Sequence, residues 1–255
     1  TDPEDVIAYG PPQEPDEPRP QQLDAEEILE RIESVDPPDA LRDPVDADDL
    51  EHRDFETGEF WRRIPAFARV DRGTFLDPRF QNMHSVTRAE QLGERLQGAV
   101  SPAFLADVED GLRLAPMALR LSPYLLSLID WANPYEDPIR RQFLPVASTR
   151  QPDHPLLTLD SLAEQDDSPV PGLVHRYPDK ALFLALDVCP VYCRFCTRSY
   201  AIGLDTEAVE KVDYKSQPKR WAKIFAYLAS RPEVEDVVVS GGDVYNLSAD
   251  RLEEI

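Results

Sequence analysis

The chain has 255 residues, 42% of them hydrophobic, and a formal net charge of −22. This apolar content is sufficient for a real core, but the acid is uneven: residues 1–60 carry a net charge of −17 and residues 61–255 a net charge of −5. Such acidity excludes nucleic acid as an expected partner, because phosphate binding requires a basic face. No apolar run reaches the length of a membrane span and no secretory signal is recognisable, so we expect no membrane partner and a cytoplasmic location.

The first half of the chain divides by composition into two regions. Residues 1–50 hold nine prolines and much of the excess acid, which predicts a disordered, acidic, proline-rich leader. Residues 51–130 show helical periodicity and predict a helical N-terminal region. Within that region we expect one helix to start at a capping box, Thr87–Glu90, and another to cover residues 101–114.

The second half of the chain predicts an α/β fold. Residues 131–180 are rich in proline and are expected to form a connector that wraps a scaffold. From residue 181 onwards, apolar runs suited to buried strands alternate with helical patterns. The expected strand, helix, strand and helix lie at residues 181–188, 218–230, 237–239 and 248–255. This order indicates the start of a βα barrel over residues 181–255, in which functional loops lie at the carboxyl ends of the strands.

One such loop holds all the cysteines of the chain, in the run Cys189-Pro-Val-Tyr-Cys193-Arg-Phe-Cys196. A closed structural metal site normally has four thiolate or imidazole ligands. Three thiolates can ligate three of the irons of an iron–sulfur cube and leave the fourth iron without a protein ligand. A metal position without a protein ligand is open to a substrate. Two alternatives stay open: three inert buried thiols, or a zinc knuckle that borrows His175.

The spacing Cys-x3-Cys-x2-Cys resembles the radical S-adenosylmethionine (SAM) superfamily. Residues from about Leu119 to Ile255 are similar to one of its families, the lysine 2,3-aminomutases, whereas the cysteines alone identify only the superfamily. The most specific matching segment is Asp-Ser-Pro-Val-Pro-Gly-Leu-Val-His-Arg-Tyr-Pro-Asp at residues 167–179. The other matching segments are residues 122–130, 137–142, 189–198 and 237–243.

The resemblance implies an enzyme, an isomerase that moves an amino group from C2 to C3 of an amino acid. Its cofactors would be a 4Fe–4S cluster, SAM and pyridoxal phosphate (PLP). The cluster would reduce SAM to give a 5′-deoxyadenosyl radical, and the substrate would be held on PLP as an imine. The implied partners are an amino-acid substrate and a reductant of the flavodoxin or ferredoxin type, and a homo-oligomer is compatible with the resemblance. The implied fold is a partial radical-SAM-type barrel that contains only the first βα units.

The resemblance also assigns roles to individual residues. Cys189, Cys193 and Cys196 would ligate three irons, and Arg198 would bind the substrate carboxylate through a bidentate fork. The backbone at Gly241, Gly242 and Asp243 would approach SAM closely, which a side chain would block. Four further positions are implied: Tyr192 and Phe195 shielding the cluster or touching adenine, and Arg176 and Tyr177 lining the PLP side of the pocket. For these aromatic residues and Arg176, ordinary packing or a surface salt bridge is the alternative interpretation.

The chain departs from the family pattern in two places near the cysteines. The run after the third cysteine reads Thr-Arg198-Ser-Tyr instead of several arginines, and residues 204–218 form a longer link than usual. The family's PLP-binding lysine would lie beyond Ile255, so we expect a truncated chain that is inactive alone. Two other functions remain open: a radical SAM enzyme without PLP, and a non-catalytic iron–sulfur-binding remnant.

Overall fold

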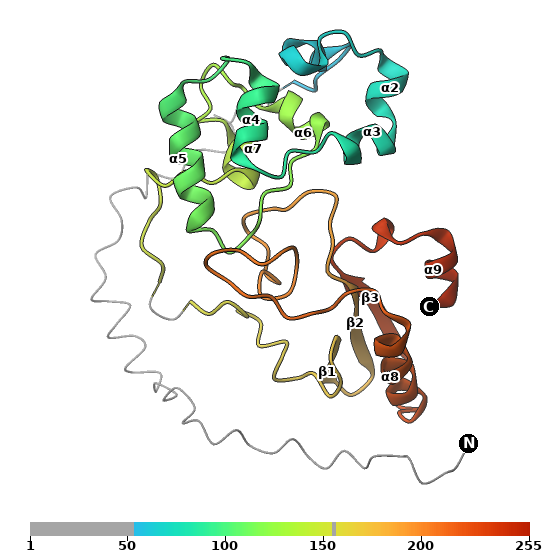
Figure 1. Cartoon of the computed structure of the whole chain (residues 1–255). Helices are drawn as coiled ribbons and strands as arrows, with labels where there is room; N and C mark the ends of the chain where they lie inside the picture. The colour runs from blue at the N-terminus through green and yellow to red at the C-terminus, as the bar shows by residue number, and fades with distance from the viewer. Residues whose placement is uncertain (1–53, 155–156) are drawn as a thin grey trace. The chain divides into compact units, whose positions relative to one another are not determined.

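The computed structural model describes residues 54–154 and 157–255, and the expected leader at residues 1–50 lies outside them. By its internal contacts the chain divides into two units, Thr1–Phe55 and Glu56–Ile255. The second unit is mixed α/β, with short helices in its first half and a three-stranded sheet in its second (Figure 1). No helix in the described ranges is both long and apolar enough to cross a membrane.

Short helices with well-defined starts form the first half of this unit. Asp71, Asp77, Ser101, Ser122 and Asp137 each accept a hydrogen bond from a backbone amide of the first turn, which satisfies donors that the helix itself cannot pair. These N-cap residues begin five of the elements. The elements are η3 (Phe60–Arg63), η4 (Pro65–Phe67), α2 (Arg72–Leu76), α3 (Pro78–Met83), α4 (Ala89–Leu96), α5 (Pro102–Arg113), α6 (Pro123–Leu128) and α7 (Pro138–Phe143).

The helix expected at residues 101–114 is confirmed as α5, but the predicted capping box at Thr87 is wrong. Helix α4 begins two residues later, with Arg88 at the N-cap and no side-chain cap. The backbone amide of Thr87 donates to Oε1 of Gln91 (2.8 Å), and its hydroxyl lies 3.2 Å from the same oxygen. The Gln91 side chain therefore takes the reciprocal role that the sequence assigned to Glu90.

An aromatic-rich core holds these helices together. The rings of Trp61 and Phe75 stack with centroids 4.5 Å apart, and Phe67 and Phe104 are buried in the same apolar cluster. The indole nitrogen of Trp61 donates to the carbonyl of Val70 (2.9 Å), so burial leaves no unpaired donor there. This core adjoins the segments around residues 116–121 and 141–142, which hydrogen-bond to the residues between the cysteines.

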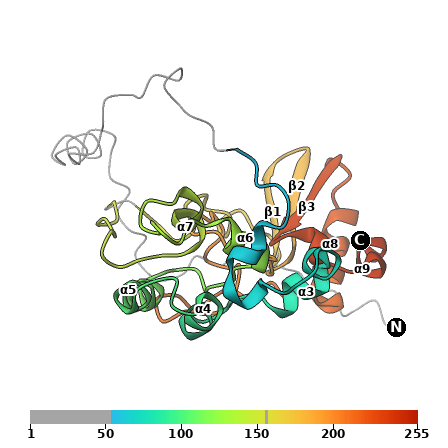
Figure 2. The same cartoon turned by 90° about the horizontal axis from the view of Figure 1, so that it is seen from above.

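The sheet has the order β1-β2-β3. Strand β1 (Leu173–Tyr177) runs antiparallel to β2 (Lys180–Leu186), which runs parallel to β3 (Asp236–Gly241). Helix α8 (Pro218–Ala229) makes the crossover between β2 and β3, and η5 (Val244–Asn246) and α9 (Ala249–Glu254) follow β3. Figures 1 and 2 place α8 beside β3.

Packing of α8 on the sheet explains the crossover. Trp221 is fully buried and meets Phe183 of β2 edge-on at 5.7 Å, and its indole nitrogen donates to the carbonyl of Ala185 (2.9 Å). The expected helices at 218–230 and 248–255 and both expected strands are therefore present. Ser248 caps α9 through the amide of Arg251.

Two features of the sheet differ from expectation. Strand β1 lies within the predicted connector, because a five-residue strand between proline-rich turns gives little periodic signal. Val238 of β3 is 52% exposed, so this strand is not buried on both faces as predicted. Val237 and Val239 pack in the cluster that contains Trp221 of α8, whereas Val238 points to the opposite face of this edge strand.

Candidate metal centre at the cysteine loop

The cysteines lie in the segment that leaves the carboxyl end of β2, residues 187–203, called the cysteine loop below. Both ends of this loop are fixed by backbone hydrogen bonds. The amide of Gly203 donates to the carbonyl of Asp187 (2.8 Å), and the amide of Asp243 donates to the carbonyl of Val188 (3.0 Å). The turn that follows β3 is thereby docked on the start of the cysteine loop, as expected for two neighbouring βα units.

Gly241 and Gly242 make this docking possible. Gly241 has φ +113°, and a Cβ built there would lie 2.2 Å from the carbonyl oxygen of Leu186. A Cβ on Gly242 would lie 2.3 Å from the carbonyl oxygen of Val188. Both positions require glycine for the contact between two strand ends, whether or not a ligand approaches them.

The helical half of the unit holds the other side of the cysteine loop. The amide of Tyr192 donates to the carbonyl of Arg120 (3.0 Å), and the guanidinium of Arg120 donates to the carbonyl of Pro190 (3.1 Å). The amide of Arg194 donates to the carbonyl of Gln142 (2.8 Å). These hydrogen bonds fix the residues between the cysteines and do not involve the thiols.

No disulfide joins the three thiols, which are partly buried and close enough to affect one another's pKa. Burial, and then the charge of Cys196, raises the pKa of Cys189 to about 11. Burial and Cys196 also raise the pKa of Cys193. A bound cation would relieve this mutual repulsion, because thiolates are the form that binds metal.

The thiols do not yet form a finished metal site. In the part of the chain that the structure describes, no three His, Cys, Asp or Glu side chains stand in an arrangement that could hold a metal ion. His175, the alternative zinc ligand, lies on β1 with its Nδ1 2.8 Å from the hydroxyl of Tyr227. The donor set is therefore three thiols on one loop, which a metal would have to draw together.

A cavity of about 780 Å³ lies beside the cysteine loop. Phe195 and Cys196 line it from the loop, and Met117 lines it from the helical half. The two aromatic residues of the motif differ sharply: Phe195 is 65% exposed and Tyr192 only 5%. Tyr192 packs in one cluster with Met117, Cys189 and Cys196, an environment that fits both shielding of the cysteines and ordinary packing, whereas Phe195 is available to a ligand.

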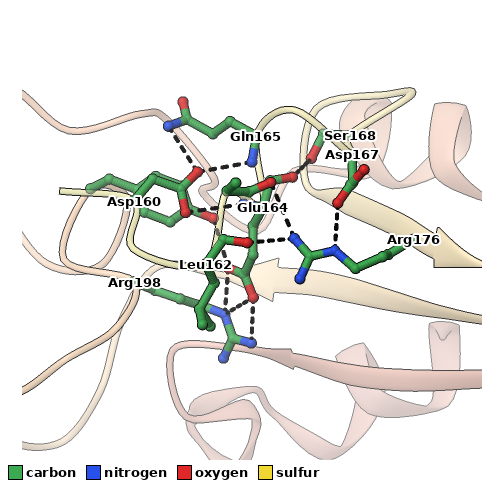
Figure 3. Close-up of polar contacts among 10 residues, drawn as sticks. Asp160, Leu162, Glu164, Gln165, Asp167, Ser168, Arg176 and Arg198 are labelled. Carbon is green, nitrogen blue, oxygen red and sulfur yellow. Dashed lines mark hydrogen bonds and ion pairs between the residues drawn. The ribbon is translucent and has the colours of Figure 1, made fainter. Parts of the chain in front are cut away.

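Arg198 is held by a carboxylate that the sequence did not single out (Figure 3). Its Nε and Nη2 donate to both oxygens of Glu164 at 2.8–3.1 Å, and the hydroxyl of Tyr200 donates to Glu164 at 2.9 Å. Glu164 is 4% exposed. Burial and the bond to Glu164 raise the pKa of Tyr200. Nη1 of Arg198 takes part in none of these bonds and remains for another acceptor.

Arg176 and Tyr177 lie away from the cysteines. Arg176 forms a salt bridge with Asp167 (2.5 Å) and also donates to the carbonyl of Leu162 (Figure 3). Because β1 is antiparallel to β2, Tyr177 pairs with Lys180 at the start of β2. The cysteine loop leaves the other end of β2, about 20 Å along the strand. Arg176 is thus in the salt bridge that was its alternative interpretation.

Asp243 is close to the cysteines, but its side chain caps the short helix that follows β3. Its side chain accepts a hydrogen bond from the amide of Tyr245 (3.1 Å) and so caps η5. Its charge also contributes to the raised pKa of Cys189. Sequence reasoning missed Glu164, which holds Arg198, and Lys211, whose ammonium donates to the carbonyls of Pro116 and Ser199. The only signal for Lys211 was the unusual length of residues 204–218, and Glu164 had none.

Comparison with known proteins gives consistent relatives, although no protein-family model matches the chain. The L-lysine 2,3-aminomutase of Clostridium subterminale is 36% identical over 198 residues, which cover 76% of this chain and 44% of that protein. The L-lysine 2,3-aminomutase of Bacillus subtilis is 32% identical over 208 residues, which cover 81% of this chain and 41% of that protein. The L-lysine 2,3-aminomutase of Fusobacterium nucleatum is 41% identical over 145 residues, which cover 56% of this chain and 31% of that protein. The chain therefore spans less than half the length of these relatives.

Proposed function

Since the chain belongs to the lysine 2,3-aminomutase family, we propose that it is the cluster-binding part of a radical SAM amino-acid 2,3-aminomutase. The observation that carries this proposal is the grouping of the chain's three cysteines on one loop at the carboxyl end of β2, docked against Gly241 and Gly242 of the next βα unit. In a protein of the length of these relatives, β2 and β3 would be the first parallel strands of a radical-SAM-type barrel.

Each part of this site has a task that its chemistry supports. Cys189, Cys193 and Cys196 would hold a 4Fe–4S cluster and leave one iron for SAM. When bound, the cluster supplies the electron that cleaves SAM. The bare backbone at Gly241 and Gly242 keeps the rim of the site free of side chains. Phe195, exposed at the cavity, offers an aromatic face to adenine.

Arg198 is the proposed anchor for the substrate carboxylate. Glu164 fixes two of its three guanidinium nitrogens, which sets the plane and direction of the group. The bidentate fork expected for the substrate is thus occupied by Glu164, and Nη1 alone remains to form a charge-assisted bond with an incoming carboxylate. Glu164 and Tyr200 are therefore positioning residues, since they act on the substrate only through Arg198.

The two residues expected to line the PLP side of the pocket do not lie beside the cysteine loop. Arg176 is engaged by Asp167, and Tyr177 lies at the opposite end of β2 from the cysteine loop. We therefore assign no step through PLP to this chain, and we expect the 255 residues alone not to move an amino group. The same observation keeps a second function open, a radical SAM reaction that uses no PLP.

The test is the formation of 5′-deoxyadenosine. The chain is purified without oxygen, supplied with iron and sulfide, reduced with dithionite and given SAM, beside a full-length relative as a positive control. We expect 5′-deoxyadenosine from the wild type and none from Cys193→Ala, while the exposed Lys219→Ala on α8 behaves as wild type. A wild-type chain that binds a cluster but gives no product, beside an active relative, would restrict this chain to metal binding. Product from Cys193→Ala would contradict the ligand assignment.

The remaining partners follow from the same proposal. An electron carrier of the flavodoxin or ferredoxin type would replace dithionite in a cytoplasmic setting, and the substrate would be an amino acid. A PLP absorbance band that appears in a full-length relative and is missing in this chain would support the aminomutase assignment. A full-length relative that cleaves SAM without binding PLP would favour the second function.

A further inference from the structure

A lysine in the long link between the cysteine loop and α8 has an unusual environment. The ammonium of Lys211 donates to the backbone carbonyls of Pro116 and Ser199 and lies 3.9 Å from the sulfur of Met117. The backbone amide of Lys211 donates to Asp205 (2.7 Å), which fixes the link locally. Lys211 therefore connects the helical half, the cysteine loop and the link through one charged group.

This cation is partly buried, and no carboxylate among the described residues forms a salt bridge with it. By contrast, Lys180 and Lys215 are exposed and pair with the neighbouring Asp179 and Asp213. Taking an ammonium out of water is costly unless its environment compensates the charge. Two carbonyls satisfy hydrogen bonds but bring no negative charge. An anion near the ammonium would add the charge compensation that the carbonyls lack.

The cysteine loop is one source of such negative charge, beside Asp205. Met117, against which the Lys211 ammonium lies, packs in one apolar cluster with Cys189 and Cys196. Ser199, whose carbonyl accepts from Lys211, is three residues beyond Cys196. Burial lowers the pKa of Lys211, and among the charges that oppose this shift Cys196 exceeds Asp205. Through its contacts with Met117 and Ser199, the ammonium lies near the part of the cysteine loop that holds Cys196.

We propose that Lys211 is the fixed positive charge that compensates the thiolate-bound cluster and raises its reduction potential. This inference rests on the proposed function, because it requires a cluster on the cysteine loop. Reduction adds negative charge to a group that three thiolates already make negative, and a nearby cation stabilises the reduced form more than the oxidised form. Partial burial strengthens this effect, since water screens the charge less.

The test compares reduction potentials of three variants. Lys211→Met removes the charge and the hydrogen bonds, Lys211→Gln removes the charge and keeps a donor, and Lys211→Arg keeps the charge. Each variant is reconstituted without oxygen, and the midpoint potential is measured by redox titration followed by electron paramagnetic resonance. We expect a lower potential in Lys211→Met and Lys211→Gln than in the wild type, and a potential near the wild type in Lys211→Arg.

The matched control is Lys215→Met, which removes an exposed lysine from the same link and is expected to leave the potential unchanged. If Lys211→Gln binds its cluster at the wild-type potential, the inference is wrong. An equal shift in all three Lys211 variants would also overturn it, since that pattern reports a structural tether and not a charge. A wild type that binds no cluster would instead overturn the proposed function, and this inference with it.

Discussion

Glu164 lies in an almost fully buried position, where its two oxygens accept hydrogen bonds from Arg198 and Tyr200. No local pattern predicts this contact: its partners are 34 and 36 residues away in sequence. The cysteines could be predicted because their spacing is local and their chemistry is specific. Arg198 could be predicted as functional, but the carboxylate that orients it could not.

The first prediction concerns this buried pair. Glu164→Gln removes the negative charge and leaves Arg198 and Tyr200 with one weaker acceptor. We expect a loss of about 2 kcal/mol in the free energy of unfolding, because hydrogen bonds to charged groups and partly buried ion pairs are worth about that much. Urea unfolding followed by circular dichroism measures it.

The control for that prediction is Asp153→Asn, which breaks an exposed salt bridge with Arg150 at 2.9 Å. Exposed pairs contribute about 0–1 kcal/mol, so this change should have little effect. Equal unfolding midpoints for Glu164→Gln and Asp153→Asn would show that the buried pair does not stabilise the chain.

At the scale of elements, the carboxyl ends of β2 and β3 are joined by backbone contacts that tolerate no side chain at Gly241 or Gly242. Periodicity predicted both strands and the helices α8 and α9. It did not predict β1, and this strand decides where Arg176 and Tyr177 lie, because an antiparallel return carries them to the far end of the sheet. The family resemblance assigned Arg176 and Tyr177 to a pocket, but the direction of β1 determines which end of the sheet they occupy.

The second prediction tests the joined strand ends. Gly241→Ala combines a positive φ with a clash against the carbonyl of Leu186, whereas Gly98→Ala has a positive φ of +88° and nothing within 4 Å of the new Cβ. We expect a loss of about 1 kcal/mol for Gly98→Ala from backbone strain. For Gly241→Ala we expect about 3 kcal/mol, since overpacking adds to the strain. Thermal unfolding that ranks the two variants equally would contradict the steric account.

The third prediction concerns the cysteine loop, whose thiols are near one another but not arranged as a finished site. Cluster assembly should draw them together and order residues 187–203, because metal binding and local folding are coupled. Hydrogen exchange of the metal-free and reconstituted chain should show added protection in this loop and none in α5. Unchanged exchange in the loop of a cluster-loaded chain would mean that the thiols need no rearrangement.

At the scale of the whole molecule, the described sheet has an outer strand, β3, whose Val238 is 52% exposed. An uncovered strand offers unpaired backbone groups to other chains. The alternation of strands and helices predicted the α/β class, but it could not predict which sheet face is covered. Coverage depends on elements distant in sequence, as the contact between α8 and Phe183 shows for the opposite face.

The fourth prediction follows from that edge. Val238→Lys should reduce concentration-dependent association of the 255-residue chain, because a charge on an edge strand opposes strand pairing. The control is Leu204→Lys, the same kind of change at a residue that is 71% exposed in the cysteine-to-α8 link. Sedimentation velocity over a range of concentrations measures both. Equal association of the two variants would show that β3 is not the contact surface.

The central claim is that this chain holds a 4Fe–4S cluster on three cysteines and leaves one iron for SAM. The most direct measurement is electron paramagnetic resonance of the reconstituted, dithionite-reduced chain before and after SAM is added, with iron and sulfide determined on the same sample. We predict about four irons per chain and a spectrum that changes with SAM, both lost in Cys193→Ala. A single metal ion per chain, or a cluster spectrum that SAM leaves unchanged, would contradict the claim.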